Sequence, residues 1–377
     1  MSVTVGAATA TGADTGQAAG LRLYTRTPVT PQWLARTVVP AARALRDDHG
    51  ASLVYLRRGW LHGPHVELHG RADRGGELPW DMIGRLLDAG PEPRSGALTE
   101  EEYLAQAREL GRLERVPPPY LPMRPHGTVE PIPVDDAARW PQPLDSLREM
   151  ALGRMCVPLM DMLEEITRDR SKASLRLAEA FTALADSHHS GAAYGTFSLR
   201  SHSEAFMAWA SARKDPRPAF NKRLNNDSPQ FRETVGKALA GEYGPHGAAW
   251  RSAFAYCMGL FDSAVAAGTL TLAGLESLGA GSDDAPTGPP GAADGSEGRP
   301  SEFHRTVAAT GLVDDPPEWF ASYRLLVNLF YQQLPLLGVS PMQRYYMCHA
   351  IAETVDEVLG ASWQERLRRM RDGGGAR

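Results

Sequence analysis

The 377-residue sequence has few cysteines, no long apolar run and no excess of positive charge. Its three cysteines, Cys156, Cys257 and Cys348, are far apart and form no C-x-x-C pair, so neither a disulfide framework nor a structural zinc site is indicated. A net charge of -5 offers no basic field for nucleic acid or an anionic membrane. No apolar run approaches the roughly 20 residues of a membrane span, and no Lys or Arg opens a signal peptide. We therefore expect a soluble cytoplasmic protein.

The sequence also lacks the motifs of two large enzyme classes. No G-x-G-x-x-G or G-x-x-x-x-G-K-[ST] pattern follows a strand, so nucleotide binding loses its usual support. No G-x-S-x-G elbow is present, so a Ser-His-Asp hydrolase of that kind is not predicted. The length and the hydrophobic content of 42% are sufficient for one large domain, or two that share an interface, with a substantial core.

Two segments have too few large side chains to form a core. Residues 1–19 are mostly Ala, Gly and Thr, which predicts a disordered tail. Residues 279–301 combine Gly, Pro, Ala, Ser and Asp, which predicts a mobile surface insertion. The remaining chain, 20–377, is predicted to fold as a single catalytic domain interrupted by that insertion.

The N-terminal part alternates strand and helix patterns. Residues 20–26 alternate with period two, and 31–46 have helical spacing with a kink expected at Pro40. Residues 52–56 and 64–69 then indicate two further strands around a glycine-containing loop. This β-α-β-β start is typical of an α+β fold in which a small sheet packs against helices.

The rest of the chain is predominantly helical in pattern. The exception is 117–133, whose prolines predict no regular element. The last long helix has a clear start, because Ser340 can cap it, Pro341 suits its first turn and Gln343 completes a capping box. The predicted helices cover 99–113, 145–167, 172–189, 202–212, 229–240, 247–278, 317–334 and 341–358.

A strand with two histidines and a glutamate is the first candidate site. His65, Glu67 and His69 alternate with apolar residues, so their side chains share one face of the strand. Such a trio can chelate a metal, but no further ligand stands at a recognised spacing. We therefore predict a solvated or substrate-facing strand face without metal.

Histidines elsewhere have simpler interpretations. His188 and His189 stand at a helix end, where imidazolium favours the dipole. Ser201 and Glu204 have capping-box spacing at the start of the next predicted helix. That interpretation leaves His202 free, and Ser198, Arg200 and His202 remain candidates to line a cleft.

The strongest candidate site lies near the C-terminus. Tyr323, Asn328 and Tyr331 interrupt an apolar helical segment at spacings that bring all three toward one helical face. Buried polar groups need a partner or a ligand. A core tyrosine with one satisfied hydroxyl is an equally good interpretation of each tyrosine.

Three segments together resemble one known family, the thiopeptide-type bacteriocin biosynthesis proteins. The segments read WLHGPHVEL, PPYLPMRPHGTVEP and LVNLFYQQLPLLGVSPMQRYYMCHAIAE, and the resemblance covers about 21–359. The family is related to the C-terminal elimination domain of class I lantibiotic dehydratases, and the pyridine synthases of thiopeptide maturation are most similar. The resemblance therefore implies the fold of that elimination domain.

Two departures from the sequence pattern of elimination domains argue against an elimination activity. Elimination domains usually have an H-[LIV]-R-[LIV]-R strand and a late His-Met segment, but here the strand reads His65-Val66-Glu67-Leu68-His69 and the late segment lacks His-Met. The groups that would hold an anionic leaving group are missing.

The resemblance implies a [4+2] cyclase that joins two dehydroalanines of a leader-bearing ribosomal peptide, with loss of water and of the leader. Two alternatives remain: a dehydrating lyase that eliminates glutamate from glutamylated Ser or Thr, and a non-catalytic leader-peptide carrier. No metal or redox cofactor is required, and the expected partners are the dehydrated precursor peptide and other maturation enzymes. The predicted catalytic residues are Tyr331, Tyr323, Asn328 and His202. The predicted substrate-binding residues are His65, Glu67, His69, Arg200, Ser203, Tyr120 and Arg124.

Overall fold

The computed structural model describes residues 18–73, 76–92, 96–114, 116–134, 140–211, 214–279, 300–311 and 316–371. Most of the predicted tail and of the predicted insertion lies outside these residues. The first strand already begins at Ala18, inside the segment predicted as a tail, and Ser301 already caps a helix.

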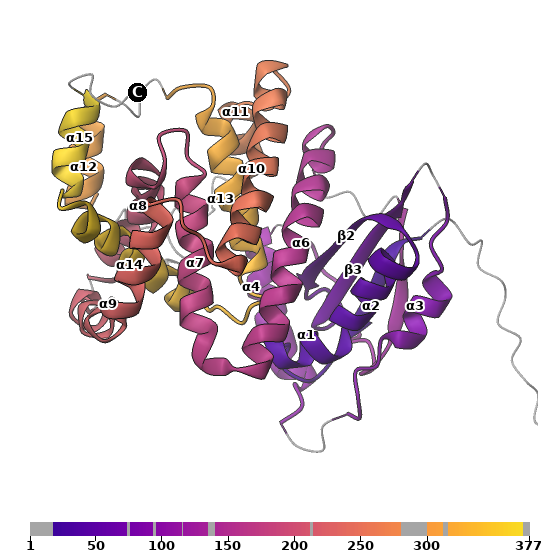
Figure 1. Cartoon of the computed structure of the whole chain (residues 1–377). Helices are drawn as coiled ribbons and strands as arrows, with labels where there is room; N and C mark the ends of the chain where they lie inside the picture. The colour runs from indigo at the N-terminus through magenta and orange to yellow at the C-terminus, as the bar shows by residue number, and fades with distance from the viewer. Residues whose placement is uncertain are drawn as a thin grey trace, which may run out of the picture.

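A four-stranded antiparallel sheet forms the N-terminal part of the fold (Figure 1). Its spatial order is β2-β3-β1-β4, so β3 and β1 are central. Leu21 pairs with Leu68 and Leu23 with Val66, which gathers apolar side chains on one face of the sheet. The strands are β1 (Ala18–Tyr24), β2 (Ala51–Gly59), β3 (His65–Ala72) and β4 (Val129–Pro133).

The prediction that 117–133 contains no regular element is wrong for β4. This strand pairs only with β1, at the edge of the sheet, where Pro131 and Pro133 can be accommodated. Proline lacks a backbone N–H, and an edge strand has one side on which no ladder bond is needed. The prolines therefore select an edge position and do not exclude a strand.

Short helices cover the apolar face of the sheet (Figure 1). They are α1 (Pro31–Thr37), α2 (Val39–Arg43), the π-helical turn η1 (Ala44–Asp48) and α3 (Trp80–Leu86). The predicted kink at Pro40 is displaced, because the helix breaks at Val38 and Pro40 occupies the first turn of α2. A proline is tolerated there because the first-turn N–H has no helical partner.

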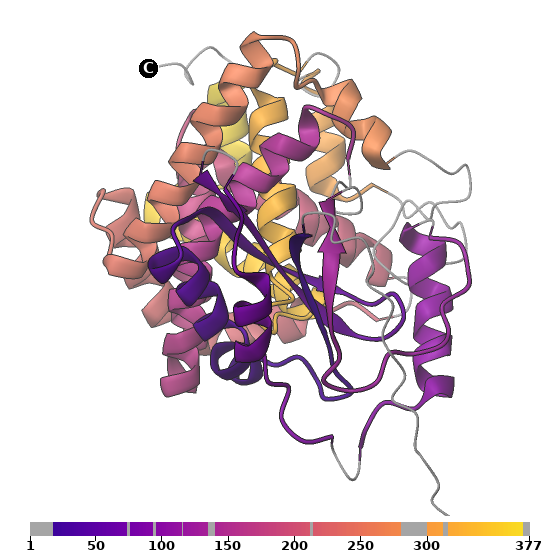
Figure 2. The ribbon, with the colours of Figure 1, turned by 90° about the vertical axis from the view of Figure 1, so that its right-hand side faces the viewer.

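The helical body makes up the rest of the fold. Helix α6 packs against both β2 and α1, and so connects the body to the sheet (Figure 1). Figure 2 shows α1 and α2 on one side of the strands and α4 on the other. Helix α4 (Glu100–Glu114) packs against the proline-rich segment in a separate small cluster. The body helices are α6 (Leu144–Arg168), α7 (Ala173–Asp186), α8 (Ala192–Ala210), α9 (Arg217–Leu239), α10 (Pro245–Ala266), α11 (Leu272–Gly279), α12 (Glu302–Ala308), α13 (Phe320–Gln333), α14 (Pro341–Leu359) and α15 (Trp363–Arg371).

One buried hydrophobic cluster continues from the sheet into this body. It runs from Leu21 on β1 through Leu152 on α6 to Val355 on α14. The α+β prediction is confirmed by this arrangement of a small antiparallel sheet and many helices. Among the described residues, no helix has the length and apolar character that crossing a membrane requires.

Helix α8, which carries His202, differs from its prediction at its start. It begins ten residues earlier than expected, at Ala192, so Ser201 and Glu204 lie in mid-helix and the predicted capping box is wrong. The missed start contains Gly195, where any side chain would overlap the carbonyl oxygen of Ala185 on α7. That glycine allows α8 to pack tightly on α7, although a mid-helix glycine costs about 1 kcal/mol relative to alanine.

Two other helix boundaries also differ from the predictions. Helix α9 begins at Arg217 instead of residue 229. The predicted helix over 247–278 is two helices, α10 and α11, with a turn between them that contains Gly268 at φ 69°. The Ser340 cap is confirmed, because its hydroxyl accepts a hydrogen bond from the Gln343 amide at 3.2 Å.

Candidate active site

Three helices bring His202, Tyr331 and Cys348 together. His202 lies on α8, Tyr331 on α13 and Cys348 on α14, and α8 and α14 pack closely along their length. The Tyr331 hydroxyl lies 3.1 Å from the Cys348 Sγ and 3.4 Å from the His202 Nδ1. Two of the four predicted catalytic residues, 129 positions apart in sequence, are therefore in direct contact.

His202 is a partly buried, neutral histidine. Its Nδ1 lies 2.9 Å from the Ser198 carbonyl oxygen, which can only accept a hydrogen bond, so the ring proton is assigned to Nδ1. Burial, assisted by the positive charge of Arg344, lowers the pKa of His202 to about 4. Near pH 7 the Nε2 atom therefore carries a lone pair. No described residue provides a hydrogen bond to that atom.

Tyr331 and Cys348 remain protonated near neutral pH. Burial, with the adjacent thiol, raises the pKa of Tyr331 well above its usual range. Burial also raises the pKa of Cys348 to about 11. The Tyr331 hydroxyl can therefore donate or accept a hydrogen bond, but it is not a phenolate base.

Arg344 is a functional candidate that the sequence analysis missed. Its guanidinium carbon lies 5.1 Å from the centre of the Tyr331 ring and 4.9 Å from that of Tyr345, and its Nη2 donates to the Tyr345 hydroxyl at 3.1 Å. A cation in the first turn of a helix opposes the helix dipole. The position of Arg344 could have identified it from the sequence, because an arginine there does not stabilise the helix and is therefore a candidate for another role.

Of the other predicted residues of this region, Tyr323 and Arg200 have structural contacts and Asn328 is exposed. Tyr323 is fully buried, and its hydroxyl donates to the Gly195 carbonyl at 3.1 Å. Asn328 is exposed, so the prediction that it shares a buried face with the two tyrosines is wrong. Arg200 forms ion pairs with Glu353 and Asp356 on α14, and so fastens α8 to that helix.

Ser203 and His188 are also satisfied by the protein. The Ser203 hydroxyl donates to the Arg200 carbonyl at 3.0 Å. The His188 ring packs edge-on against Trp319 and Tyr323, and burial together with His189 lowers its pKa to about 4. The prediction of an imidazolium at that helix end is therefore wrong for His188.

The strand trio forms a buried ionic cluster. His65, Glu67 and His69 are between 1% and 3% exposed, so the prediction of a solvated strand face is wrong. Tyr24 and Tyr55 from the two neighbouring strands cover the histidines, with ring centroids 4.8 and 4.5 Å apart. A substrate contact for the trio remains a prediction.

Glu67 is the centre of that cluster. Its carboxylate lies 3.0 Å from Arg22 Nε, 3.0 Å from His69 Nε2 and 3.6 Å from Arg57 Nη1. Burial alone would raise the pKa of Glu67, but hydrogen bonds from His65 and His69, with the charge of Arg57, hold it far below its usual range. Within the described ranges, no group of three His, Cys, Asp or Glu residues has an arrangement suited to a metal ion.

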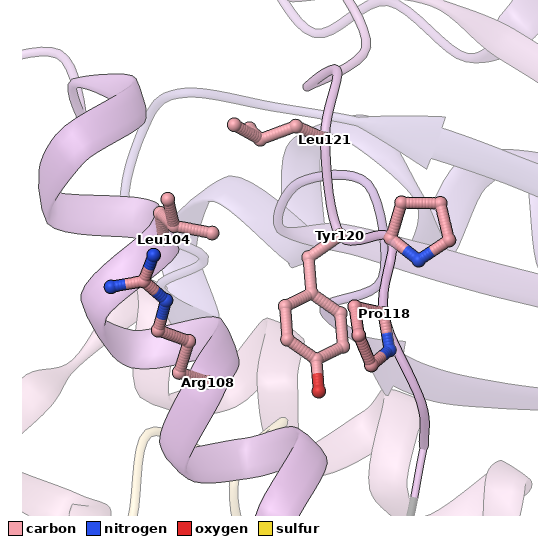
Figure 3. Close-up of a pocket in the computed structure, with 6 residues that line it drawn as sticks. Leu104, Arg108, Pro118, Tyr120 and Leu121 are labelled. Carbon is pink, nitrogen blue, oxygen red and sulfur yellow. The ribbon is translucent and has the colours of Figure 1, made fainter.

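The proline-rich segment forms a separate apolar cavity with α4. Figure 3 shows Leu104 and Arg108 of α4 beside Pro118, Tyr120 and Leu121 of the proline-rich segment. The cavity that these residues line has a volume of about 460 Å³. The Tyr120 hydroxyl donates to the Val116 carbonyl at 2.8 Å. This cavity shares no lining residue with the site around His202.

Arg124, the other predicted substrate-binding residue of this segment, has an acidic partner. Its Nε lies 2.8 Å from the Glu130 carboxylate on β4. That ion pair connects the proline-rich segment to the edge strand. Substrate binding by Tyr120 and Arg124 remains a prediction.

Two solved structures share the fold of this chain. One is "Pyridine synthase, TbtD, from thiomuracin biosynthesis", with a TM-score of 0.63 and 22% identity over 90% of this chain and 98% of that chain. The other is TsrL, with a TM-score of 0.53 and 16% identity over 93% of this chain and 97% of that one. Neither a family model nor a curated protein sequence matches the chain.

The chain therefore has the fold of a thiopeptide pyridine synthase along nearly its whole described length, as the sequence resemblance predicted. At these identities the likeness establishes the fold. The relationship to the elimination domain of lantibiotic dehydratases remains a prediction.

Proposed function

We propose that the protein is a pyridine-forming cyclase that acts on a leader-bearing peptide with two dehydroalanines. The observation that carries the proposal is the match of nearly the whole chain to almost the complete length of a pyridine synthase. The neutral His202 beside Tyr331 and Arg344 supports it, because the reaction needs hydrogen-bonding groups and no redox step.

The proposed reaction balances without an oxidant. One dehydroalanine, with its preceding amide as the iminol tautomer, provides four atoms, and the second dehydroalanine provides two. Two new bonds close a six-membered nitrogen ring, and loss of water and then of the leader as a carboxamide gives the aromatic pyridine. Holding the two dehydroalanines in near-attack geometry can supply roughly 7 to 11 kcal/mol.

The site residues have complementary roles in this proposal. The Nε2 lone pair of His202 takes the amide proton from nitrogen and returns it to the carbonyl oxygen, which gives the iminol tautomer with no net change in protons. The guanidinium of Arg344 donates hydrogen bonds to that oxygen and stabilises the negative charge that it carries in between. The Tyr331 hydroxyl fixes the position of the imidazole ring.

The test uses two synthetic leader-bearing peptides, one with two dehydroalanines and one with a glutamylated serine in place of each. The bis-dehydroalanine peptide is expected to lose water and leader and to gain the ultraviolet absorbance of a pyridine, followed by mass spectrometry. Turnover of the glutamylated peptide alone would establish the lyase alternative. Binding of both peptides with no mass change would establish the carrier alternative.

A further inference from the structure

A second cavity, of about 700 Å³, lies where the sheet end of the molecule meets the helical body. It is lined by the start of α1, the end of β2, the end of α6 and the turn between α13 and α14. Gly338 in that turn has φ 70°, and a side chain there would press against the Pro31 ring of α1. The turn therefore closes tightly on α1 and forms one wall of the cavity.

The charged lining of this cavity is entirely positive. Arg58 from β2 and Arg170 from η3 (Arg170–Lys172), the short 3-10 helix that follows α6, both line it, and none of its lining residues is acidic. Among the described residues, neither arginine has an ion pair or a side-chain hydrogen bond. Two uncompensated guanidinium groups in one cavity favour an anionic ligand, because carboxylates and phosphates match their geometry.

The cavity also offers neutral polar groups and an apolar floor. Thr30, Gln32 and Gln343 supply hydrogen-bonding side chains. Ile166 and Leu337 are buried apolar residues of the lining. A volume of several hundred cubic ångströms is typical of small-ligand sites. The lining therefore suits an amphipathic ligand with an anionic group, and not a small inorganic ion alone.

This cavity and the candidate active site share the first turn of α14. Gln343 lines the cavity, and the next residue, Arg344, lies over the Tyr331 ring. The first turn of α14 forms a wall of the cavity on one side and carries the Arg344 cation on the other.

We propose that this cavity binds a carboxylate-bearing segment of the peptide substrate, with Arg58 and Arg170 pairing with its Asp or Glu side chains. The identity of the ligand as substrate rests on the proposed function. The pairing itself rests on the two arginines and the absence of an acid in the cavity lining.

The experiment compares Arg58→Gln and Arg170→Gln with the wild type. Two bis-dehydroalanine peptides are used, one that contains Asp and Glu residues and a matched one in which every Asp and Glu is replaced by Asn or Gln. Each variant is expected to raise KM for the acidic peptide about tenfold with kcat unchanged. The neutral peptide is expected to bind weakly to the wild type and to be insensitive to both substitutions.

Arg168→Gln is the matched control, since Arg168 is exposed at the same end of α6 but does not line the cavity. Thermal unfolding of each variant confirms that it is folded, and both arginines lack protein partners, so little change is expected. Equal KM values for wild type and both variants with the acidic peptide would overturn the proposal.

A parallel binding assay separates this inference from the proposed function. Fluorescence anisotropy with labelled acidic and neutral peptides reports on the cavity even when no peptide is turned over. If acidic and neutral peptides bind alike, and millimolar inorganic phosphate stabilises the wild type but not the arginine variants, the cavity is a site for a free inorganic anion and the peptide proposal fails. Arginine-dependent binding of the acidic peptide without turnover would keep the cavity assignment and reject the cyclase.

Discussion

Two regions of this protein contain histidine, tyrosine and arginine in close contact, yet they differ in what completes them. On the sheet, the Glu67 carboxylate is surrounded by Arg22, His65 and His69, and is almost fully buried. On the helical body, His202 has one ring nitrogen bonded to Ser198, and its second nitrogen has no partner among the described residues. The first cluster is completed by the protein, whereas the second leaves a hydrogen-bonding position for another molecule.

This comparison shows why residue type alone does not identify a site. A charge that is compensated within the protein contributes to the integrity of the fold, and removing one partner leaves the others buried and unpaired. A polar atom left accessible beside shielded neighbours is available for chemistry. Substitutions in the sheet cluster are therefore expected to change stability, whereas substitutions around His202 are expected to change turnover.

The largest effect is expected from Glu67→Ala on the sheet. Removing the carboxylate leaves Arg22 and the two histidines without their central partner, which is expected to lower the free energy of unfolding by about 3 to 5 kcal/mol. Urea unfolding followed by circular dichroism measures this change. The matched control is Glu233→Ala, because Glu233 pairs with Lys237 on an exposed helix surface and its removal should change stability little. Equal costs for the two variants would remove the distinction between the regions.

The next effect is expected from His202→Ala on the helical body. Loss of the Nε2 acceptor is expected to lower kcat for the bis-dehydroalanine peptide by about 10² to 10⁴-fold. His189→Ala is the control, because that histidine is 43% exposed and pairs with Asp262. Full activity of the His202 variant would remove this residue from the chemistry.

Tyr331→Phe is expected to have a smaller effect on turnover, of roughly 10 to 1,000-fold. The substitution deletes the hydroxyl that contacts Cys348 and His202 and keeps the ring on Phe181 and beneath Arg344. Peptide turnover and thermal unfolding are measured on the same preparation. Normal turnover with clearly reduced stability would make Tyr331 a structural residue of the core.

The pH dependence of stability provides a further distinction. His188 and His202 have pKa values of about 4 in the folded protein, lowered mainly by burial, against about 6.5 in an unfolded chain. The unfolded state therefore binds more protons between these values, so stability is fully present above about pH 6.5 and is lost as pH falls toward 4.

Between about pH 7.5 and pH 5.5, each of these two histidines is expected to lower the free energy of unfolding by about 1 kcal/mol. His188→Phe is expected to reduce the loss by that amount, as measured by urea unfolding at both pH values. An unchanged pH dependence in this variant would mean that His188 is solvated enough to become protonated in the folded protein.

The smallest effect is expected from Asn328→Ala. The side chain is exposed on α13, so stability is expected to change by no more than about 0.5 kcal/mol. Its KM and kcat are expected to stay within about twofold of the wild type, because it lies outside the contacts of Tyr331 with His202 and Cys348. A large loss of turnover with normal stability would restore the catalytic role that the sequence analysis predicted.

The elements predicted best are those with local signals. Helix α14 has a capping serine, a first-turn proline and a buried apolar face, and its observed start agrees with those signals. Helix α8 was predicted too short because its first turns contain Gly195, Thr196 and Ser198, which have weaker helix preference than alanine or leucine. Its beginning is stabilised by packing against α7 and α13, and no local pattern reports such contacts.

The site was predicted in part for a similar reason. Tyr331 and His202 were selected separately, from helical spacing and from a histidine without a structural explanation, and the fold brings them together. The strand spacing correctly predicted that His65, Glu67 and His69 share a face. It did not predict burial, because the side chains that cover the face come from β1 and β2.

The position of the candidate active site depends on the smallest residue near it. Gly195 allows the carbonyl of Ala185 to touch α8, and its own carbonyl accepts the Tyr323 hydroxyl two helical turns before His202. A methyl group at this position would displace α8 along or away from α7 and would carry His202 with it. A larger residue at this glycine would therefore require compensating changes in α7 and α13 to keep His202 in place.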